Sequence, residues 1–262
     1  MRLPLYQIDA FADRLFAGNP AAVVPLEEWL PETVMQAIAA ENNLAETAFF
    51  RREGADYALR WFTPTVEVEL CGHATLASAH VIFRFLEPGR EAVRFRTLKA
   101  GMLGVTRHGE ALALDFPSYP PEPCALPPEL PAALGANPVE LHRHGQRYLA
   151  VFAAAEDVAA LAPDFARLRR QGHGDLIATA PGSDGVDFVS RFFAPAHGID
   201  EDPVTGSAHC VLAPYWGKRL GKERLEARQI SRRGGALTCT LSGERVAISG
   251  RCVLYLEGWI TV

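Results

Sequence analysis

Cysteine is scarce in this sequence, and long apolar runs are absent. The five cysteines are an odd number, and neither CxxC nor HxxxH spacing indicates a zinc site. The most apolar stretch, YLAVFAAA at residues 148–155, is far shorter than the roughly 20 residues that a membrane-spanning helix requires. Basic residues do not outnumber acidic ones, 26 against 31, so no positive field is available for a phosphate backbone. These absences argue against a zinc protein, a membrane protein and a nucleic-acid-binding protein.

The opening residues, MRLPLYQIDAFADRLF, lack the charged start, unbroken apolar core and small-residue cleavage site of a secretory signal. We therefore expect a cytoplasmic protein whose cysteines stay reduced. Hydrophobic residues make up 48% of the chain and charged residues 22%, which is typical of a compact folded protein rather than a disordered one.

The chain repeats itself. RWFTPT at residues 60–65 returns as RFFAPA at residues 191–196, an offset of 131 residues. KAGMLGVTRHGEALAL at residues 99–114 matches RGGALTCTLSGERVAI at residues 233–248, an offset of 134. Three extra residues therefore fall between the two matches, and a self-similarity of this length predicts two equivalent structural units.

Placing the extra residues within HGIDEDPVTG pairs Gly72 with Gly206. We expect an N-terminal half at residues 1–118 and a C-terminal half at residues 119–262, joined by a connector at residues 117–138. Each half is predicted to hold strands, a helix, more strands, a glycine-started core helix and final strands with glycine turns. The first helices are expected near residues 31–42 and 162–172.

The connector contains eight of the nineteen prolines. Proline has no N–H for a sheet ladder, so the connector is expected to hold at most a short helix. Pro214 falls inside the second core helix, where it should bend or end the helix at a cost of roughly 3 kcal/mol.

The two glycine-started helices point to an anionic ligand. The first N–H groups of a helix have no partner within it and together carry about half a positive charge. Gly72 and Gly206 let a ligand approach the backbone closely, and Thr205 and Ser207 are able to cap the second helix start. If the halves pack about a pseudo-twofold axis, the two helix starts could hold the same carboxylate from both sides. A small carboxylic acid is therefore the expected ligand.

Four segments in order resemble the PhzF-like family of phenazine biosynthesis: FAGNPAAVV, NNLAETAFF, ELCGHATLASA and DPVTGSAHC. The resemblance extends over the whole chain. It implies an α+β fold of the diaminopimelate epimerase type, with two similar pseudo-symmetric domains, each a mixed rolled, barrel-like sheet around a central helix. It also implies a site between the domains, a homodimer, and an isomerase or epimerase-like enzyme that needs neither cofactor nor metal.

Carried over to this sequence, the resemblance makes Glu46 the acid/base that moves a proton between carbons. It gives His73, Asp202 and Ser207 roles in holding substrate and positioning the proton. Asn19, Gly72, Ala74 and Gly206 are expected to complete the substrate pocket.

Moving hydrogen between carbons requires a base and donors for the charge that develops on the neighbouring carboxyl or carbonyl group. For Glu46 to accept and return a proton, we expect partial burial to raise its pKa toward the working pH. The helix N–H groups are expected to act as the donors.

Two rival interpretations stay open. Cys71 could be one thiol of a two-thiol racemase, since a helix start favours a thiolate, but the resemblance to the epimerases puts the partner cysteine where this chain has Pro203, and Cys210 lies within the helix. A Cys71–His73 hydrolase pair is disfavoured because these neighbours diverge at a helix start. The chain could also be a non-catalytic protein that binds a small acid.

Overall fold

The chain forms two compact units. The computed structural model describes residues 1–171 and 174–262, and the structure of each unit is described separately. The first unit comprises Met1–Asp115 together with Ser249–Val262, and the second comprises Phe116–Ile248.

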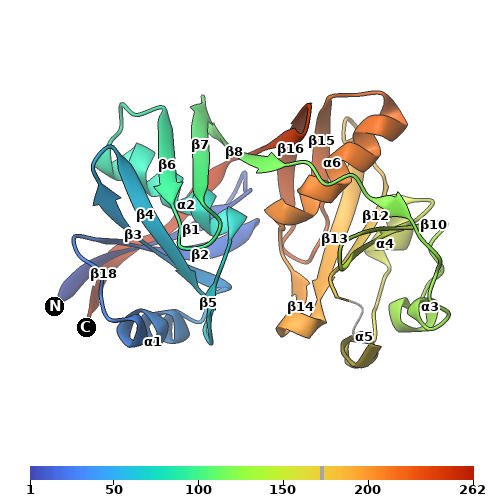
Figure 1. Ribbon diagram of the computed structural model, residues 1–262, viewed down its shortest axis with the longest axis horizontal. Helices are drawn as coiled ribbons and strands as arrows, with labels where there is room; N and C mark the ends of the chain where they lie inside the picture. Colours follow the sequence, from blue (N-terminus) through green and yellow to red (C-terminus); the bar gives the residue numbers. More distant parts are fainter. Residues whose placement is uncertain (172–173) are drawn as a thin grey trace. The chain divides into compact units, whose positions relative to one another are not determined.

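The first unit contains two α-helices, one π-helical turn and a strand-rich sheet (Figure 1). Its helical segments are α1 (Glu32–Asn42), α2 (Gly72–Val81) and the π-helical turn η1 (Ile82–Leu86). Its strands are β1 (Arg2–Ala10), β2 (Asn19–Leu26), β3 (Glu46–Glu53), β4 (Asp56–Phe62), β5 (Glu67–Val68), β6 (Ala92–Arg96), β7 (Met102–His108), β8 (Ala111–Pro117, whose last two residues belong to the second unit) and β18 (Cys252–Thr261).

The strands of the first unit pair in a mixed order. β1 lies antiparallel to both β18 and β2, β2 runs parallel to β3, and β3 is antiparallel to β4. β4 then pairs antiparallel with β5 and parallel with β6, and β7 follows antiparallel to β6 and β8. Parallel neighbours need a crossover, which α1 supplies between β2 and β3 and α2 supplies between β4 and β6.

Helix α2 is the core of this unit. Apart from Gly72 and His80, all of its residues are buried, and it contacts β1, β2, β3 and β18. A helix that is apolar on every side has no face to offer to water and must be enclosed. The rolled sheet around it supplies that enclosure, while α1 packs its buried Met35 and Ile38 against the other side of the sheet.

The second unit is built from the same kinds of element. Its helices are α3 (Leu130–Leu134), α4 (Ala155–Ala159), α5 (Phe165–Gln171), the 3-10 turn η2 (Pro195–His197) and α6 (Gly206–Leu220). Its strands are β9 (Glu122–Pro123), β10 (Glu140–His144), β11 (Arg147–Val151), β12 (Leu176–Pro181), β13 (Phe188–Ala194), β14 (Ile199–Asp202), β15 (Arg224–Gln229), β16 (Gly235–Ser242) and β17 (Arg245–Gly250, whose last two residues belong to the first unit).

The pairing of these strands repeats that of the first unit. β10 is antiparallel to β11, β11 is parallel to β12, and β12 is antiparallel to β13. β13 pairs antiparallel with β14 and parallel with β15, and β15 is antiparallel to β16. The order of parallel and antiparallel pairs matches from β1–β7 to β10–β16, and both core helices begin at the predicted glycines. The repeat seen in the sequence is therefore a repeat of structure.

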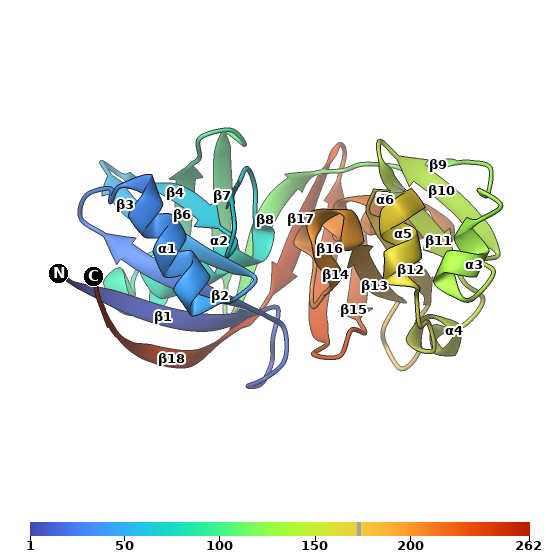
Figure 2. The same ribbon diagram turned by 90° about the horizontal axis from the view of Figure 1, so that it is seen from below.

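The last strand does not lie where the sequence placed it. Residues 249–262 were expected in the C-terminal half, but β18 pairs with β1 from Arg2↔Thr261 to Ala10↔Cys252 and so belongs to the first unit. The N-H of Val262 also donates to the carbonyl of Met1, at 2.9 Å. The two chain ends lie side by side in both ribbon views (Figure 2).

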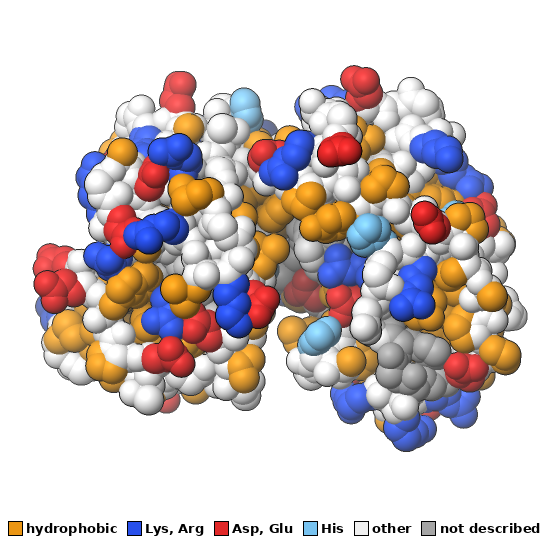
Figure 3. All heavy atoms as spheres, viewed as in Figure 1, with side chains coloured by type: hydrophobic (Ala, Val, Ile, Leu, Met, Phe, Trp, Pro, Cys, Tyr) orange, Lys and Arg blue, Asp and Glu red, His pale blue; other side chains and the backbone are white. Residues whose placement is uncertain are grey.

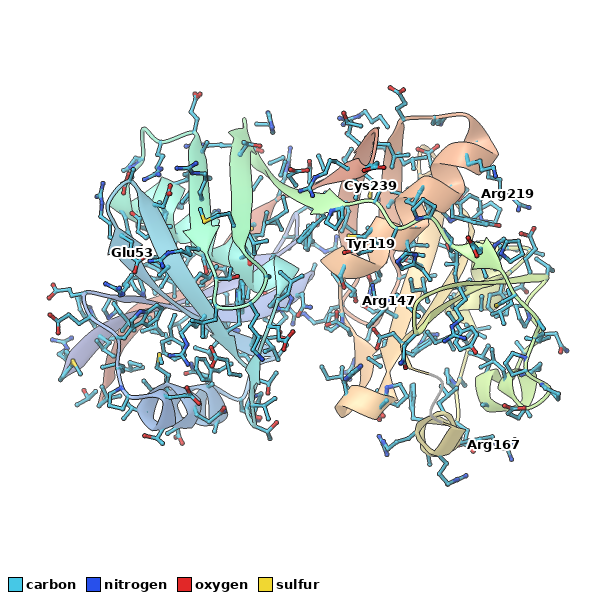
Figure 4. All side chains as sticks on the ribbon, viewed as in Figure 1. Glu53, Tyr119, Arg147, Arg167, Arg219 and Cys239 are labelled. Carbon is cyan, nitrogen blue, oxygen red and sulfur yellow. The ribbon has the colours of Figure 1, made fainter. Side chains whose placement is uncertain are left out.

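The proline-rich connector contains one short helix, α3, as expected, and also the two-residue strand β9 paired with β10. The helix does not end at Pro214, because α6 continues through it to Leu220. A proline at this place leaves the carbonyl of Cys210, four residues earlier, without its helical donor. The backbone N–H of Tyr119 in the connector donates to that carbonyl at 2.8 Å, so the helix is preserved and the connector is fixed to it (Figure 4).

Within the part of the chain that the structure describes, no helix is both long and apolar enough to cross a membrane. On the visible face of each unit, basic side chains are interspersed with acidic ones rather than gathered in a field (Figure 3).

Candidate active site

Helix α2 begins at Gly72, after Cys71 in extended conformation (φ −142°, ψ 109°). No side chain caps this helix start, so the first N–H groups are not satisfied by a local side-chain oxygen. The hydroxyl of Thr75 instead donates to the carbonyl of Cys71 at 2.6 Å and fixes the other side of the first turn. The helix start is thus held in place without a side-chain oxygen on its first N–H groups, although the N–H of Ala74 faces Sγ of Cys71.

Two parallel strands bring further polar groups to this helix start. Asn19 is the first residue of β2 and Glu46 is the first residue of β3, and the register pairs Ala21 with Glu46. Because parallel neighbours start at the same edge of a sheet, these two side chains come to one place. The described residues of the first unit therefore gather Asn19, Glu46, Gly72 and His73.

His73 lies at the centre of this group. Its Nε2 is 3.1 Å from a carboxylate oxygen of Glu46, and its Nδ1 is 3.2 Å from the amide nitrogen of Asn19 and 3.4 Å from Sγ of Cys71. The side chains of His73 and Glu46 are only 7% and 13% exposed, so their interaction is little screened by water.

The pKa values of this pair move in opposite directions. Burial alone would raise the pKa of Glu46, but the charge and hydrogen bond of His73 outweigh it and the pKa is lowered. Burial alone would lower the pKa of His73, but Cys71 and Glu46 outweigh it and the pKa rises well above its ordinary range. The sequence-based expectation that the pKa of Glu46 is raised was wrong, because it considered burial without the neighbouring imidazole. Glu46 is a carboxylate at neutral pH and can accept a proton.

Cys71 is a thiol rather than a thiolate. Burial and the charge of Glu46 raise its pKa to about 11, opposite to the effect expected at a helix start. Ligand atoms of Glu46, Cys71 and His73 all lie within 4.8 Å of one another, so the three side chains form a group able to hold a metal ion. Carboxylate, thiolate and imidazole are ligands that suit zinc.

Helix α6 repeats the geometry in the second unit. It begins at Gly206 after Thr205 in extended conformation, and His209 donates Nδ1–H to the carbonyl of Thr205 at 2.9 Å, as Thr75 does to Cys71. The expected capping by Thr205 does not occur, because its hydroxyl donates to the carboxylate of Asp202. Asp202, Gly206 and Ser207 thus lie together in the second unit.

Two residues without any signal in the sequence hold this second helix start. Buried Gln229 accepts the N–H of Thr205 at 2.8 Å and donates to the carbonyl of Asp202 at 2.7 Å. Arg147 donates to the carbonyl of Ser207 at 2.9 Å and is itself paired with Asp175 at 2.9 Å. Neither residue type is unusual in a strand, and only the folded chain shows what each one binds.

Neither Gly72 nor Gly206 is among the described glycines with positive φ. Their backbone conformation therefore does not require glycine.

A family model described as phenazine biosynthesis-like protein, PhzC-PhzF, matches residues 8–258. The chain belongs to this family. The PhzC-PhzF match includes every predicted site residue, from Asn19 to Ser207.

The relatives agree with this assignment. The chain is 53% identical over 258 residues to a protein of Pseudomonas aeruginosa named an uncharacterized isomerase, with 98% of each chain covered. A crystal structure of a PhzF-family protein from Enterococcus faecalis matches with a TM-score of 0.97 and 50% identity, covering 100% of both chains. A hydroxyproline epimerase from Agrobacterium vitis matches with a TM-score of 0.62 at 11% identity, covering 99% of this chain and 92% of that one, which shows a shared fold. The α+β fold is thus that of PhzF proteins and epimerases, as the resemblance implied.

Proposed function

We propose that this member of an isomerase and epimerase-like family moves a proton between carbons of a small carboxylic acid, with Glu46 as acid and base. The observation that carries the proposal is the buried ion pair between Glu46 and His73 at the uncapped start of α2. Glu46 takes the proton from a substrate carbon and returns it to another carbon of the same molecule.

His73 assists Glu46 in two ways. Its positive charge keeps Glu46 ionised before the reaction, which makes the carboxylate ready as a base. When Glu46 has taken the substrate proton, the remaining charge of His73 stabilises negative charge that develops on the substrate. The amide nitrogen of Asn19 lies 3.2 Å from Nδ1, on the other side of the ring from Glu46.

The backbone at residues 72–74 supplies donors for the substrate carboxyl or carbonyl oxygen. Preorganised N–H groups directed at a developing negative charge are worth about 2.7 to 4 kcal/mol each in the transition state. The repeat relation between Gly72 and Gly206 supports extending the proposal to Gly206, Ser207 and Asp202, which we propose as substrate-binding and proton-positioning groups.

The test is proton exchange with solvent. A panel of small mono- and dicarboxylic acids is incubated with the enzyme in deuterium oxide, and incorporation of deuterium at substrate carbon is followed by NMR and mass spectrometry. We expect exchange with at least one acid, loss of exchange in Glu46→Gln, and retention after dialysis against a chelator, because no cofactor or metal takes part in the proposed step. A fully active Glu46→Gln enzyme would exclude Glu46 as the acid/base.

The same experiment separates an enzyme from a non-catalytic binding protein. Both bind a small acid, but only the enzyme exchanges hydrogen at carbon. We also propose a homodimer, which light scattering of the purified protein tests: a mass of one chain contradicts it.

A further inference from the structure

A second group of charged side chains lies in the first unit, away from Glu46 and His73. It lines a surface hollow of about 460 Å³ formed by the end of α2, the turn η1, the turn after β7 and the start of β18. Its charged and titratable lining consists of Asp13, His80, Arg84, Arg107, Glu110 and Arg251. The proposed isomerisation uses none of these residues.

The hollow has a positive excess that its own carboxylates do not balance. Three arginines face two carboxylates, and both carboxylates have cationic partners: Glu110 pairs with Arg251 and Asp13 pairs with Arg14, each at 3.2 Å. The two carboxylate side chains are 79% and 59% exposed, and exposed pairs of this kind contribute little free energy. Two arginines thus remain without a carboxylate in a chain whose net charge is −5.

Those two arginines come from different elements. Arg84 lies in η1 and forms no ion pair with any described residue, and its guanidinium is 5.8 Å from the ring of Phe85. Arg107 lies in β7 and donates to the carbonyls of Gly109 at 3.2 Å and Pro88 at 3.4 Å. These backbone contacts orient the Arg107 guanidinium and leave N–H groups for another acceptor.

The pKa of His80, at the end of α2, reflects the positive charge of the hollow. Burial, Arg84 and Arg107 together lower its pKa to about 4, so the ring is neutral at physiological pH. Its buried Nε2 has no hydrogen-bond partner. A negative helix end explains a cation such as Arg84 on the same segment, but it does not explain Arg107 and Arg251 brought from β7 and β18.

We propose that this hollow binds a phosphate-type oxyanion, either free or as the phosphate group of a small molecule. Guanidinium groups match the oxygens of phosphate with paired N–H donors and keep their charge at every physiological pH. The volume is within the range of small-molecule sites and exceeds what inorganic phosphate alone fills. The site is separate from the proposed active site.

The test is calorimetric titration of the whole protein with inorganic phosphate and with glycerol phosphate, at ionic strength held constant with chloride. We expect saturable binding of at least one of them, weakened tenfold or more in Arg84→Gln and in Arg107→Gln. Arg94→Gln is the matched control, because it removes one positive charge from the same unit at an exposed pair with Asp56 outside the hollow. Binding of glycerol phosphate alone identifies an organic phosphate, and equal binding of both shows that the free anion suffices.

A second readout does not depend on the arginine variants folding well. NMR titration of the His80 ring with and without phosphate should show a rise of its pKa by one unit or more, since a bound anion offsets the two arginines. The proposal is overturned if neither phosphate binds, if Arg94→Gln weakens binding as much as the two hollow variants, or if the His80 titration does not move.

Discussion

At the scale of single residues, the chemistry of the first unit depends on two side chains that change each other's ionisation. A buried carboxylate alone would hold its proton, and a buried imidazole alone would lose it. At 3.1 Å each reverses the effect of burial on the other. The pair is consequently charged at neutral pH.

Replacing His73 by Gln should raise the pKa of Glu46, because burial then acts without an opposing charge. In the wild type, the lowered pKa of Glu46 contributes stability above the ordinary carboxyl range, and that stability is lost as the pH falls through the lowered value. The acid limb of the activity profile should therefore move to higher pH in His73→Gln. Solvent-deuterium exchange measured from pH 4 to pH 9 checks this, and an unchanged acid limb contradicts the pairing.

Cys71→Ala should retain substantial exchange activity, because the thiol has a pKa of about 11 and is not ionised at neutral pH. The variant loses one weak contact of the His73 ring, so we expect a reduction of less than about tenfold, or ~1.4 kcal/mol. Initial exchange rates of wild type, Cys71→Ala and Cys71→Ser provide the measurement. Complete loss in both variants would restore the two-thiol mechanism.

Only part of the candidate site could be found from the residue pattern. The glycine helix starts were visible in the repeat, and His73 is next to one of them. Glu46 and Asn19 were recognised through the family resemblance alone, since the parallel pairing that brings β2 and β3 together is not visible in either segment. The ionisation of Glu46 could not be inferred either, because it depends on a contact between residues 27 positions apart.

At the scale of elements, the second helix start depends on the strand beside it. The side chain of Gln229, at the end of β15, forms hydrogen bonds with both ends of the segment 202–205, and the residue is 1% exposed. A buried amide with both ends paired fixes this turn more firmly than a surface side chain does.

Gln229→Leu should destabilise the protein by about 2 to 4 kcal/mol, since it removes the acceptor of the buried Thr205 N–H and the donor to the part-buried carbonyl of Asp202. Gln229→Glu is the matched variant, because its oxygen still accepts from Thr205 while the donor to Asp202 is lost. Urea unfolding of the three proteins tests the order wild type, Glu variant, Leu variant. A Leu variant as stable as the wild type would show that the turn is held by other contacts.

The elements themselves were largely predictable, and the exception is instructive. Hydrophobic periodicity and glycine gave both core helices and their starts. Pro214 does not end the helix as propensity alone allows, because the carbonyl that it leaves unpaired has a donor 91 residues earlier, at Tyr119. Tertiary contacts of this kind decide whether an interior proline breaks a helix.

At the scale of the whole molecule, the first unit is built from two separate stretches of the chain. β18 follows the second repeat along the sequence, but it pairs with β1 and belongs to the first unit. The repeat in the sequence predicted two halves but not this pairing, because the partner of β1 is not encoded in the repeat itself.

Residues 1–118 alone should therefore fold poorly, since β1 lacks one of its two partners, β18, over nine residue pairs. Joining residues 249–262 to Met1 through a short linker should restore a cooperative thermal transition, because Val262 and Met1 are already hydrogen-bonded. Circular dichroism melts of the two polypeptides provide the comparison, with a linker-joined polypeptide carrying a scrambled 249–262 segment as the control. Equal melting of all three would show that β18 is dispensable.

The pairing of β18 with β1 also has a consequence for synthesis. While the nascent chain is still on the ribosome, the first unit can collapse around α2, but β18, one of the two neighbours of its first strand, has not yet been translated. That unit is completed only after residues 249–262 leave the exit tunnel. A prematurely terminated polypeptide thus presents an open β1 edge to other chains, and the cell has reason to degrade it before it aggregates.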